Sequence, residues 1–392
     1  MAAVAALYER RNQLTYLRSA LIERRYSKLT RCRVYLTIVR MMSIVFLNLD
    51  GPSVSTQFRL PSRVQAENLT KSGYVFLEKQ TSFFASFIRW FDASAATPPI
   101  ENGSRHQVDW VRTAPFIAVH LMCLGVIWVG WSWVAVGVAA LLYAIRMFAV
   151  TGIYHRYFSH RTFKTSRPMQ LALALLANSA TQRGPLWWAA HHRQHHLYSD
   201  TENDVHSPRI HGFIWSHVGW ITDHRNFPTK LDAVRDLAKF PELRFLDRFD
   251  TLVPFLTGAS LYFLGAALSH FAPGLHTSGM QMLIWGFFVS TVVLFHATCT
   301  INSLAHQMGR RRFDTGDDSR NSLLLALLTF GEGWHNNHHH FPSTVHQGFY
   351  WWEIDITYYL LRALSWTGLI WDLKPVPAKV KDLNRYADEA AA

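Results

Sequence analysis

Cysteine is scarce in this chain. Only three are present among 392 residues, and Cys32, Cys123 and Cys299 stand too far apart to form a CxxC pair. This spacing argues against a disulfide framework, a zinc ribbon or an iron–sulfur cluster within the chain. A GxGxxG segment opening a strand–helix–strand unit is also lacking, so we expect no built-in flavin or nicotinamide domain.

Charged residues are few as well, at 17% of the chain against 49% hydrophobic residues. The hydrophobic residues are not spread as a soluble core would need, but gather in blocks at 114–130, 133–150, 252–268 and 280–298. A helix needs roughly 20 apolar residues to cross the hydrocarbon layer. The blocks therefore predict an all-α integral-membrane protein with four transmembrane helices, arranged as two hairpins.

The charges that remain are mostly basic, with a formal net charge of +12. They flank the apolar blocks and accompany many tryptophans, so we expect them to face anionic lipid headgroups or an anionic substrate rather than nucleic acid. The segment between the hairpins is rich in Lys and Arg, whereas the two hairpin tips carry none. Because cytoplasmic loops carry the basic excess, the tips are predicted to be external and the termini cytoplasmic.

Three regions are expected along the chain. Residues 1–113 form a basic N-terminal region without recognisable chemistry, apart from an amphipathic stretch at 83–91 that suits a membrane surface. Residues 114–377 form the main domain, in which the spans are capped on the cytoplasmic side by helical segments at 151–248 and 302–377. Residues 378–392 are a C-terminal tail.

Histidine is the residue that this chain has in excess. Nine of the 21 histidines fall into four clusters around the spans: His155 and His160 in HRYFSH, His192, His195 and His196 in HRQHH, His306 in NSLAH, and His335, His338 and His339 in HNNHH. Residues at i, i+3 and i+4 share one helix face, so each HxxHH is expected to point three imidazoles at one volume. His155 and His160 are a turn and a half apart, which favours their serving two neighbouring ions. Nine imidazoles are too many for one tetrahedral zinc and suit two metals with four or five ligands each.

The identity of the metal is less determined than its ligands. Imidazole suits Zn, Cu, Fe and Ni, and iron is favoured because a membrane-facing site without thiolates suits oxygen chemistry. Neighbouring carboxylates are candidates to orient the imidazoles through the second ring nitrogen, or are ordinary surface charges: Asp200, Glu202, Asp204 and Glu332. The isolated histidines are expected to be ordinary surface or core residues: His106, His120, His211, His224, His270, His276, His296 and His346. A metal transporter, the non-enzyme alternative, would carry its ligands within the spans, whereas these clusters lie at their ends.

The motifs HRYFSHRTFKTSR, WWAAHHRQHHLYSDTENDVHSP, WSHVGW, INSLAH and GEGWHNNHHHFP resemble the stearoyl-CoA desaturase family, most closely its bacterial members. The resemblance runs from about 108 to 377 and implies four transmembrane helices under a cytosolic cap that holds two iron ions. It makes the nine histidines the metal ligands, with Asn302 holding a metal through water, while His191 and His340 are not expected to be ligands. It also implies residues that shape the acyl tunnel: Gln182, Trp188, Thr298, Tyr143 and, one turn after Tyr143, Met147.

The resemblance further implies an activity. A long-chain acyl-CoA would be desaturated at the Δ9 position with O2 as co-substrate, in a bacterial inner membrane with the active site cytoplasmic. Animal members carry an arginine near the CoA headgroup where this chain has Ala190, so an acyl-lipid desaturase remains an alternative, as does a hydroxylase on the same centre. Electrons would come from a separate ferredoxin, or a cytochrome b5 with its reductase, because the tail is too short for a fused donor domain.

Overall fold

The computed structural model describes residues 87–95 and 106–386 of the chain. Expectations about the remaining residues, which include most of the basic N-terminal region and the last residues of the tail, lie outside the described part. The start of the amphipathic stretch at 83–91 also lies outside it, and residues 87–91 are helical. The described part is mostly helical. It contains one two-stranded antiparallel sheet, in which β1 (Lys164–Thr165) pairs with β2 (Ile370–Trp371).

Four helices are long and apolar enough to cross a membrane, as the apolar blocks predicted. The first joins α3 (Trp110–Met122), η1 (Cys123–Gly125) and α4 (Val126–Val129), and the second joins α5 (Trp133–Phe148) to the π-helix η2 (Ala149–Ser159). The third is α12 (Leu252–Phe271), and the fourth joins α13 (Gly279–Gln281), the π-helix η7 (Met282–Val289), α14 (Ser290–Ser303) and η8 (Leu304–His306). The second and fourth helices continue past the ends of the apolar blocks, so both reach into the cap.

Local sequence explains the tight first hairpin. Gly130 ends α4 with a φ of 62°, a left-handed conformation that suits glycine. Ser132 then caps α5, because its side chain accepts a hydrogen bond from the backbone N–H of Ala135 at 3.1 Å. Large apolar side chains on the four helices remain exposed in the isolated chain, among them Trp128, Phe263 and Phe271. This exposure is what lipid-facing helices require, and the chain is a multi-pass membrane protein.

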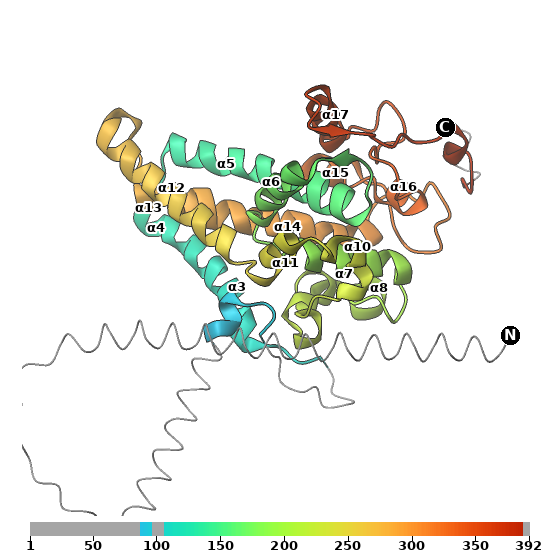
Figure 1. The fold of residues 1–392 in the computed structure, drawn as a ribbon, viewed down its shortest axis with the longest axis horizontal. Coiled ribbons are helices and arrows are strands. Elements are labelled where there is room, and N and C mark those ends of the chain that lie inside the picture. The colour runs from blue at the N-terminus through green and yellow to red at the C-terminus, as the bar shows by residue number, and fades with distance from the viewer. Residues whose placement is uncertain (1–86, 96–105, 387–392) are drawn as a thin grey trace, which may run out of the picture. The chain divides into compact units, whose positions relative to one another are not determined.

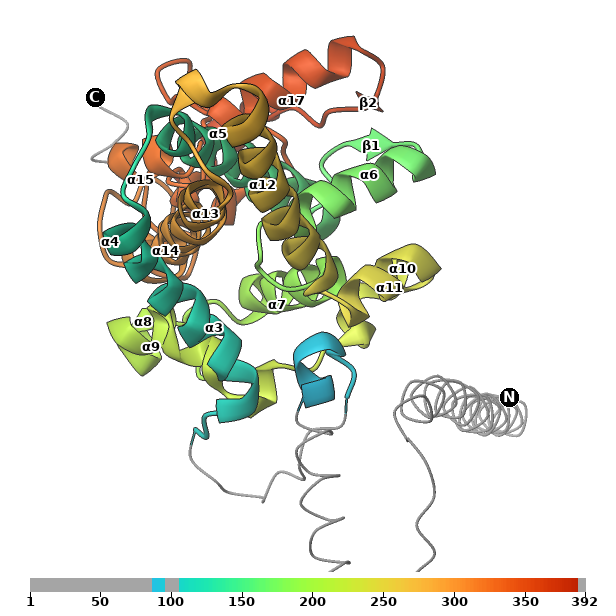
Figure 2. The same ribbon diagram turned by 90° about the vertical axis from the view of Figure 1, so that its left-hand side faces the viewer.

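The shorter elements gather at one end of the four helices (Figures 1 and 2). They are α6 (Arg167–Asn178), α7 (Pro185–Tyr198), α8 (Pro208–His211), α9 (Phe213–His217), η3 (Gly219–Thr222), η4 (His224–Asn226), η5 (Leu231–Val234), α10 (Arg235–Ala238), α11 (Pro241–Arg248), α15 (Leu323–Leu328), α16 (His335–His340), α17 (Ile356–Trp366) and η9 (Ala378–Lys381). The 3₁₀ helix η6 (Pro273–Leu275) instead lies in the second hairpin tip.

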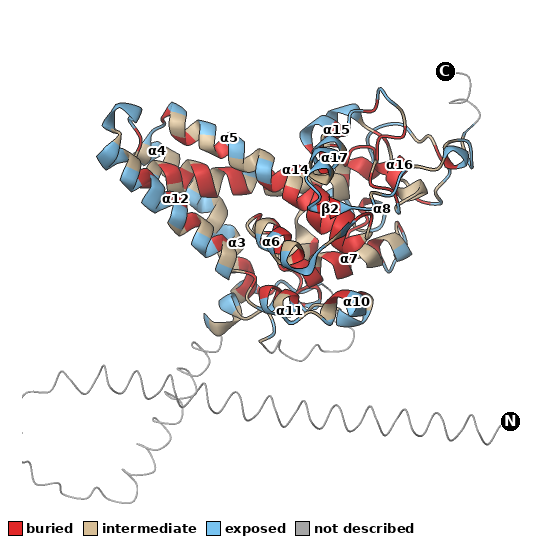
Figure 3. Cartoon of the chain, turned by 45° about the horizontal axis from the view of Figure 1, so that its top comes forward, coloured by how far each residue is buried: buried red, intermediate tan, exposed pale blue. Residues whose placement is uncertain are grey.

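Burial is concentrated in this cap, while the far ends of the long helices are largely exposed (Figure 3). The main core forms where η2 packs on α6 and α7, with Ile153, Phe158, Leu186 and Ala189 all buried. Because η2 is the continuation of a transmembrane helix, the cap is built directly onto the second span. That continuity places the first histidines of the sequence motifs inside the cap core.

Candidate metal centre

Helix α7 carries the HRQHH motif and begins at a well-defined N-terminus. Pro185 occupies its first position, where the missing N–H costs no hydrogen bond. The carboxylate of Asp247, from α11, accepts hydrogen bonds from the backbone N–H groups of Leu186 at 3.0 Å and Trp187 at 2.7 Å. Burial, the largest cause, raises the pKa of Asp247 to about 6. The capped helix holds three histidines of the motif in fixed directions.

His155 stands on the π-helix η2 and His160 directly follows its last residue, and this corrects the expectation that the two histidines serve two different ions. The backbone N–H of His160 donates to the carbonyl of His155, a bond from residue i+5 to residue i, at 3.2 Å. A π-helix places residues five apart on one face, and the two ring centroids are 4.9 Å apart. Both rings therefore belong to one cluster.

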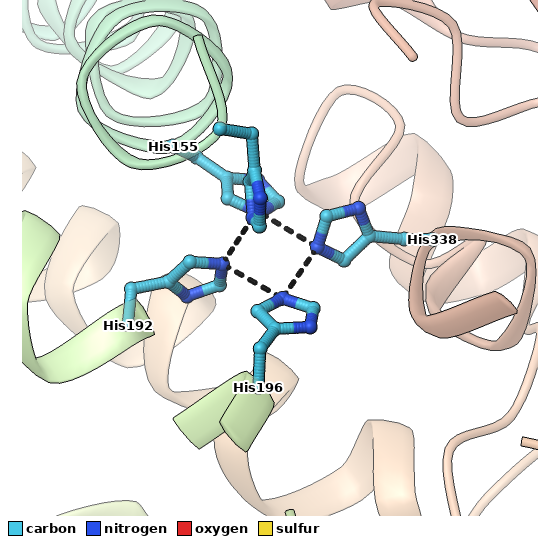
Figure 4. Close-up of side chains that lie close together, drawn as sticks. His155, His192, His196 and His338 are labelled. Atoms are coloured by element: carbon cyan, nitrogen blue, oxygen red, sulfur yellow. Dashed lines mark hydrogen bonds between the residues drawn. The ribbon is translucent and has the colours of Figure 1, made fainter. Parts of the chain in front are cut away.

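The first cluster contains five histidines, whose ligand nitrogens all lie within 4.8 Å of one another: His155, His160, His192, His196 and His338. The Nε2–Nε2 distances are 2.7 Å for His160–His192, 3.0 Å for His192–His196, 2.8 Å for His196–His338 and 3.0 Å for His155–His338. Figure 4 shows four of these rings pointing toward one another, with His155 on one side, His192 and His196 from the same helix, and His338 opposite. The arrangement joins η2, α7 and α16 around a single volume.

The second cluster contains four histidines, whose ligand nitrogens also lie within 4.8 Å of one another: His195, His306, His335 and His339. His306 Nε2 lies 3.1 Å from His335 Nε2. Asn302 lies on α14, about one turn before His306, and lines the cavity described below. All nine histidines of the sequence motifs are thus brought together, and His191 and His340 are in neither cluster.

The expectation that each HxxHH motif points three imidazoles at one volume is wrong. On α7, His192 and His196 join the first cluster while His195 joins the second. On α16 the division is reversed, since His335 and His339 join the second cluster and His338 the first. Residues i and i+4 differ by about 40° around a helix, whereas i+3 lies about 100° from i+4, at 3.6 residues per turn. Each motif therefore serves both clusters, one through its i, i+4 pair and the other through i+3.

Four of these histidines contact a carboxylate through their second ring nitrogen, Nδ1. Three are among the sequence candidates: Glu332 pairs with His155 Nδ1, Asp204 lies 2.9 Å from His195 Nδ1, and Asp200 lies 2.8 Å from His306 Nδ1. Glu202 is exposed and has no such role. The fourth carboxylate, Asp317, lies 2.6 Å from His339 Nδ1. Sequence reasoning missed it because a separation of 22 residues across a loop follows no helical spacing.

These pairings determine what the clusters can bind. A neutral imidazole that donates its Nδ1 proton to a carboxylate has only a lone pair at Nε2. His339 Nε2 is buried without a hydrogen-bond partner. Burial, followed by neighbouring histidines, holds the pKa values of five further histidines well below the usual range: His160, His192, His196, His335 and His338. Converging nitrogen lone pairs without protons form a donor set that fits metal cations.

A largely apolar cavity lies beside the first cluster. Its lining includes His192, Gln182, Trp188 and Thr298, and Gln182 Nε2 donates to Thr298 Oγ1 at 2.9 Å. Three of the five tunnel residues implied by the resemblance therefore line it. The other two, Tyr143 and Met147, are not in its lining but pack in a neighbouring apolar cluster that also contacts Trp188. Tyr143 donates its hydroxyl to the carbonyl of Leu328 at 2.6 Å.

Fold and site together define a multi-pass membrane protein with two convergent histidine clusters beside an apolar cavity. Comparisons with known proteins specify this class further. The fatty acid desaturase family model matches residues 131–367. The chain is 37% identical over 280 residues to the sn-1 stearoyl-lipid 9-desaturase of Anabaena variabilis, covering 70% of this chain and 97% of that protein.

Plant relatives show similar identity. The Acyl-CoA C20 Delta5-desaturase of Anemone leveillei is 37% identical over 286 residues, covering 70% of this chain and 87% of the relative. The Delta-9 acyl-lipid desaturase 2 of Arabidopsis thaliana is 36% identical over 278 residues, with 70% and 85% coverage. The chain belongs to the fatty acid desaturase family and is a desaturase-type oxidoreductase, which confirms the resemblance. Its relatives differ in acyl carrier and in double-bond position.

Proposed function

We propose that this protein introduces a double bond at the Δ9 position of a long-chain acyl-CoA, using O2 at a di-iron centre. The observation that carries the proposal is the position of the first histidine cluster, because His192 lines the apolar cavity together with Trp188 and Gln182. An acyl chain in that cavity would lie beside the metal-binding volume. Confinement of this kind selects which carbon is attacked, since reacting groups must be held within a few tenths of a nanometre.

Iron is the proposed metal, with the five histidines of the first cluster holding one ion and the four of the second holding the other. Asn302 would contribute to the second site through water, since it precedes His306 by about one turn. When bound and reduced, the iron pair supplies the oxygen chemistry that breaks unactivated C–H bonds. Asp200, Asp204, Asp317 and Glu332 fix the tautomers and orientations of the ligating rings.

Acyl-CoA is the proposed carrier because basic groups exceed acidic ones at the cavity. Arg89, Arg112 and Arg183 line it and share two carboxylates, Asp109 and Asp250. The remaining positive charge suits an anionic headgroup. Position 190 holds a fully buried alanine where animal members carry an arginine near the headgroup, so that arginine has no counterpart at this position. An acyl-lipid desaturase is the second candidate, favoured by the acyl-lipid relatives from Anabaena and Arabidopsis.

The test is product analysis with purified full-length protein in phospholipid nanodiscs, loaded with Fe²⁺ and supplied with O2 and a ferredoxin system. One arm receives stearoyl-CoA or palmitoyl-CoA, and the other contains only phospholipids with saturated chains. Mass spectrometry of double-bond position should find Δ9 products in the acyl-CoA arm. Products confined to the phospholipid arm would establish the acyl-lipid alternative, and hydroxylated products would contradict desaturation.

We also propose that the centre faces the cytoplasm of a bacterial inner membrane. Ten or more Lys and Arg residues lie between the second and third spans, and none lies in the two hairpin tips. Labelling of single cysteines placed in the tips, in intact cells with an impermeant maleimide, measures the orientation. Tips that react only after the inner membrane is permeabilised would reverse the proposed orientation.

A further inference from the structure

Three histidines outside the metal clusters form a continuous hydrogen-bonded chain. His120 on α3 and His296 on α14 approach through their Nε2 atoms at 3.1 Å. The other nitrogen of His296, Nδ1, lies 3.0 Å from Nε2 of His217 on α9. His217 Nδ1 lies 3.0 Å from the hydroxyl oxygen of Ser303. The chain thus connects the first span, the fourth span and the cap.

Both ends of this chain are backbone carbonyls, which can only accept hydrogen bonds. His120 Nδ1 lies 2.8 Å from the carbonyl oxygen of Phe116. At the other end, the Ser303 hydroxyl lies 2.9 Å from the carbonyl oxygen of Cys299. Five polar contacts therefore follow one another from Phe116 to Cys299.

The number of protons decides how these contacts can be satisfied. Three neutral imidazoles provide one N–H each and the serine provides one O–H, so four protons serve five contacts. When all three histidines are neutral, one of the five contacts must place two lone pairs opposite each other. One additional proton, shared along the chain, makes all five contacts into hydrogen bonds. Neighbouring ring nitrogens at 3.0–3.1 Å allow that proton to move from one ring to the next.

The hydrogen-bonded histidines lie beside the cavity in which the proton would be used. His120 and Cys299 line the apolar cavity, and so does Asn302, the residue before Ser303. His217 is half-buried on the short cap helix α9, where Ile214 is 80% exposed. Within the described part of the chain, none of the three rings pairs with a carboxylate that would hold the proton in place. Burial, the largest cause, lowers the pKa of His217, which favours release of the proton over its retention.

The reaction proposed above consumes protons. Desaturation of R–CH2–CH2–R′ by O2 yields R–CH=CH–R′ and two waters, and this balance requires two electrons and two protons from outside the substrate. The O–O bond and two C–H bonds break, while a C=C π bond and four O–H bonds form. The substrate supplies two hydrogens, and a separate electron-transfer protein supplies the two electrons.

We propose that His217, His296, His120 and Ser303 form a proton relay that carries one exchangeable proton along the cavity wall and delivers it to the desaturation reaction. This inference rests on the proposed function. Glutamine at position 217 or 296 would keep a donor and an acceptor but could not take up a proton at one atom and release it from another. The variants His217→Gln and His296→Gln therefore separate proton transfer from simple hydrogen bonding.

Loss of a positioned acid–base group typically lowers the rate by roughly 10²-fold or more. Because water can replace part of this proton transfer, we expect turnover in either variant to fall at least tenfold. Hydrogen peroxide released per O2 consumed should rise, because two-electron-reduced oxygen that receives no proton at the site leaves without O–O cleavage and takes its two protons from the solvent instead. Iron content and double-bond position should stay unchanged in both variants. His270→Gln, in the last turn of α12 beside the second hairpin tip, is the control and should behave as the parent protein.

A second measurement does not depend on turnover. Solid-state ¹⁵N NMR of histidine-labelled protein at pH 6 should show ring nitrogens that share a proton, and these signals should be absent from His296→Gln. Absence of proton-sharing signals assignable to this set of rings in the parent protein, or their persistence in His296→Gln, would overturn the relay, as would unchanged peroxide release in both variants. Absence of any double bond from the parent protein would instead contradict the proposed desaturation, while the spectra would still decide whether the chain carries a proton.

Discussion

Replacing Asp317 by asparagine should weaken metal binding at the second histidine cluster while leaving the first largely intact. Asp317 Oδ2 lies 2.6 Å from His339 Nδ1, and His339 Nε2 is a buried nitrogen without a partner among the described residues. Burial acts to raise the pKa of Asp317, but His339 and hydrogen bonds from Ser319 and Thr315 hold it well below the usual range. The carboxylate is therefore ionised throughout the working pH range, and asparagine removes a negative charge at every pH tested.

The expected magnitude follows from the role of such carboxylates. A carboxylate behind a ligating imidazole raises the basicity of the ring, and its loss typically costs 10–100-fold in metal affinity. This corresponds to roughly 1.4–2.7 kcal/mol at tenfold per 1.4 kcal/mol. Asparagine keeps the shape of the side chain, and its amide oxygen can still accept from Ser319 N–H, which lies 3.0 Å from Asp317 Oδ1. The loop should consequently stay folded, and the thermal unfolding temperature of the metal-free protein should change little.

The assay is competition for Fe²⁺ against a chelator of known affinity, with iron counted per chain. Asp317→Asn should lose one of two irons at chelator concentrations that leave the parent protein loaded. Asp318→Asn is the matched control, because that neighbouring side chain is partly exposed and, among the described residues, pairs with Arg209 and Arg311 at 3.6–3.8 Å. Iron affinity in Asp317→Asn within twofold of the parent value would refute the assignment of Asp317 as the support of a metal ligand.

Three further predictions concern ligands, chain length and electron supply. Alanine at any of the nine clustered histidines should remove most activity, whereas His340→Ala should retain much of it, because His340 donates to the carbonyl of Val380 and stacks on Phe313 outside both clusters. One tightly held zinc at full activity would contradict the di-iron assignment. Met147→Ala should shift preference from palmitoyl towards stearoyl substrates by about 1–3 kcal/mol. An unchanged product profile would contradict the prediction that Met147 lies at the end of the acyl tunnel. Purified protein should be inactive until a ferredoxin, or a cytochrome b5 with its reductase, is added, and the rate should fall as salt screens attraction to the basic cap. Sustained turnover with NADPH and no second protein would disprove this requirement.

The sequence by itself determined the number of spans and the histidines that gather in the two clusters. Apolar blocks long enough to cross a bilayer are a local property, so they identify the four membrane helices without knowledge of their packing. Six of the nine clustered histidines were identifiable for a similar reason, since the i, i+3, i+4 spacing of the two HxxHH motifs places their rings on one side of a helix. The other three, His155, His160 and His306, were included through the motifs that the resemblance rests on. Asp200, Asp204 and Glu332 could be suggested because they lie close to the histidine motifs in the chain.

Tertiary structure alone decided how the clustered histidines are divided between the two clusters. Whether His160 follows His155 onto the same face depends on π-helical hydrogen bonding in η2, which is stabilised by burial in the cap and leaves no periodic trace in the sequence. The division of each HxxHH motif between two clusters depends on α7 and α16 facing each other across both volumes. The 100° between positions i+3 and i+4 decides which cluster a ring joins only when a second helix supplies the matching rings. The pairing of Asp317 with His339 and the chain from His120 to Ser303 likewise join residues that only the packing of distant segments brings together.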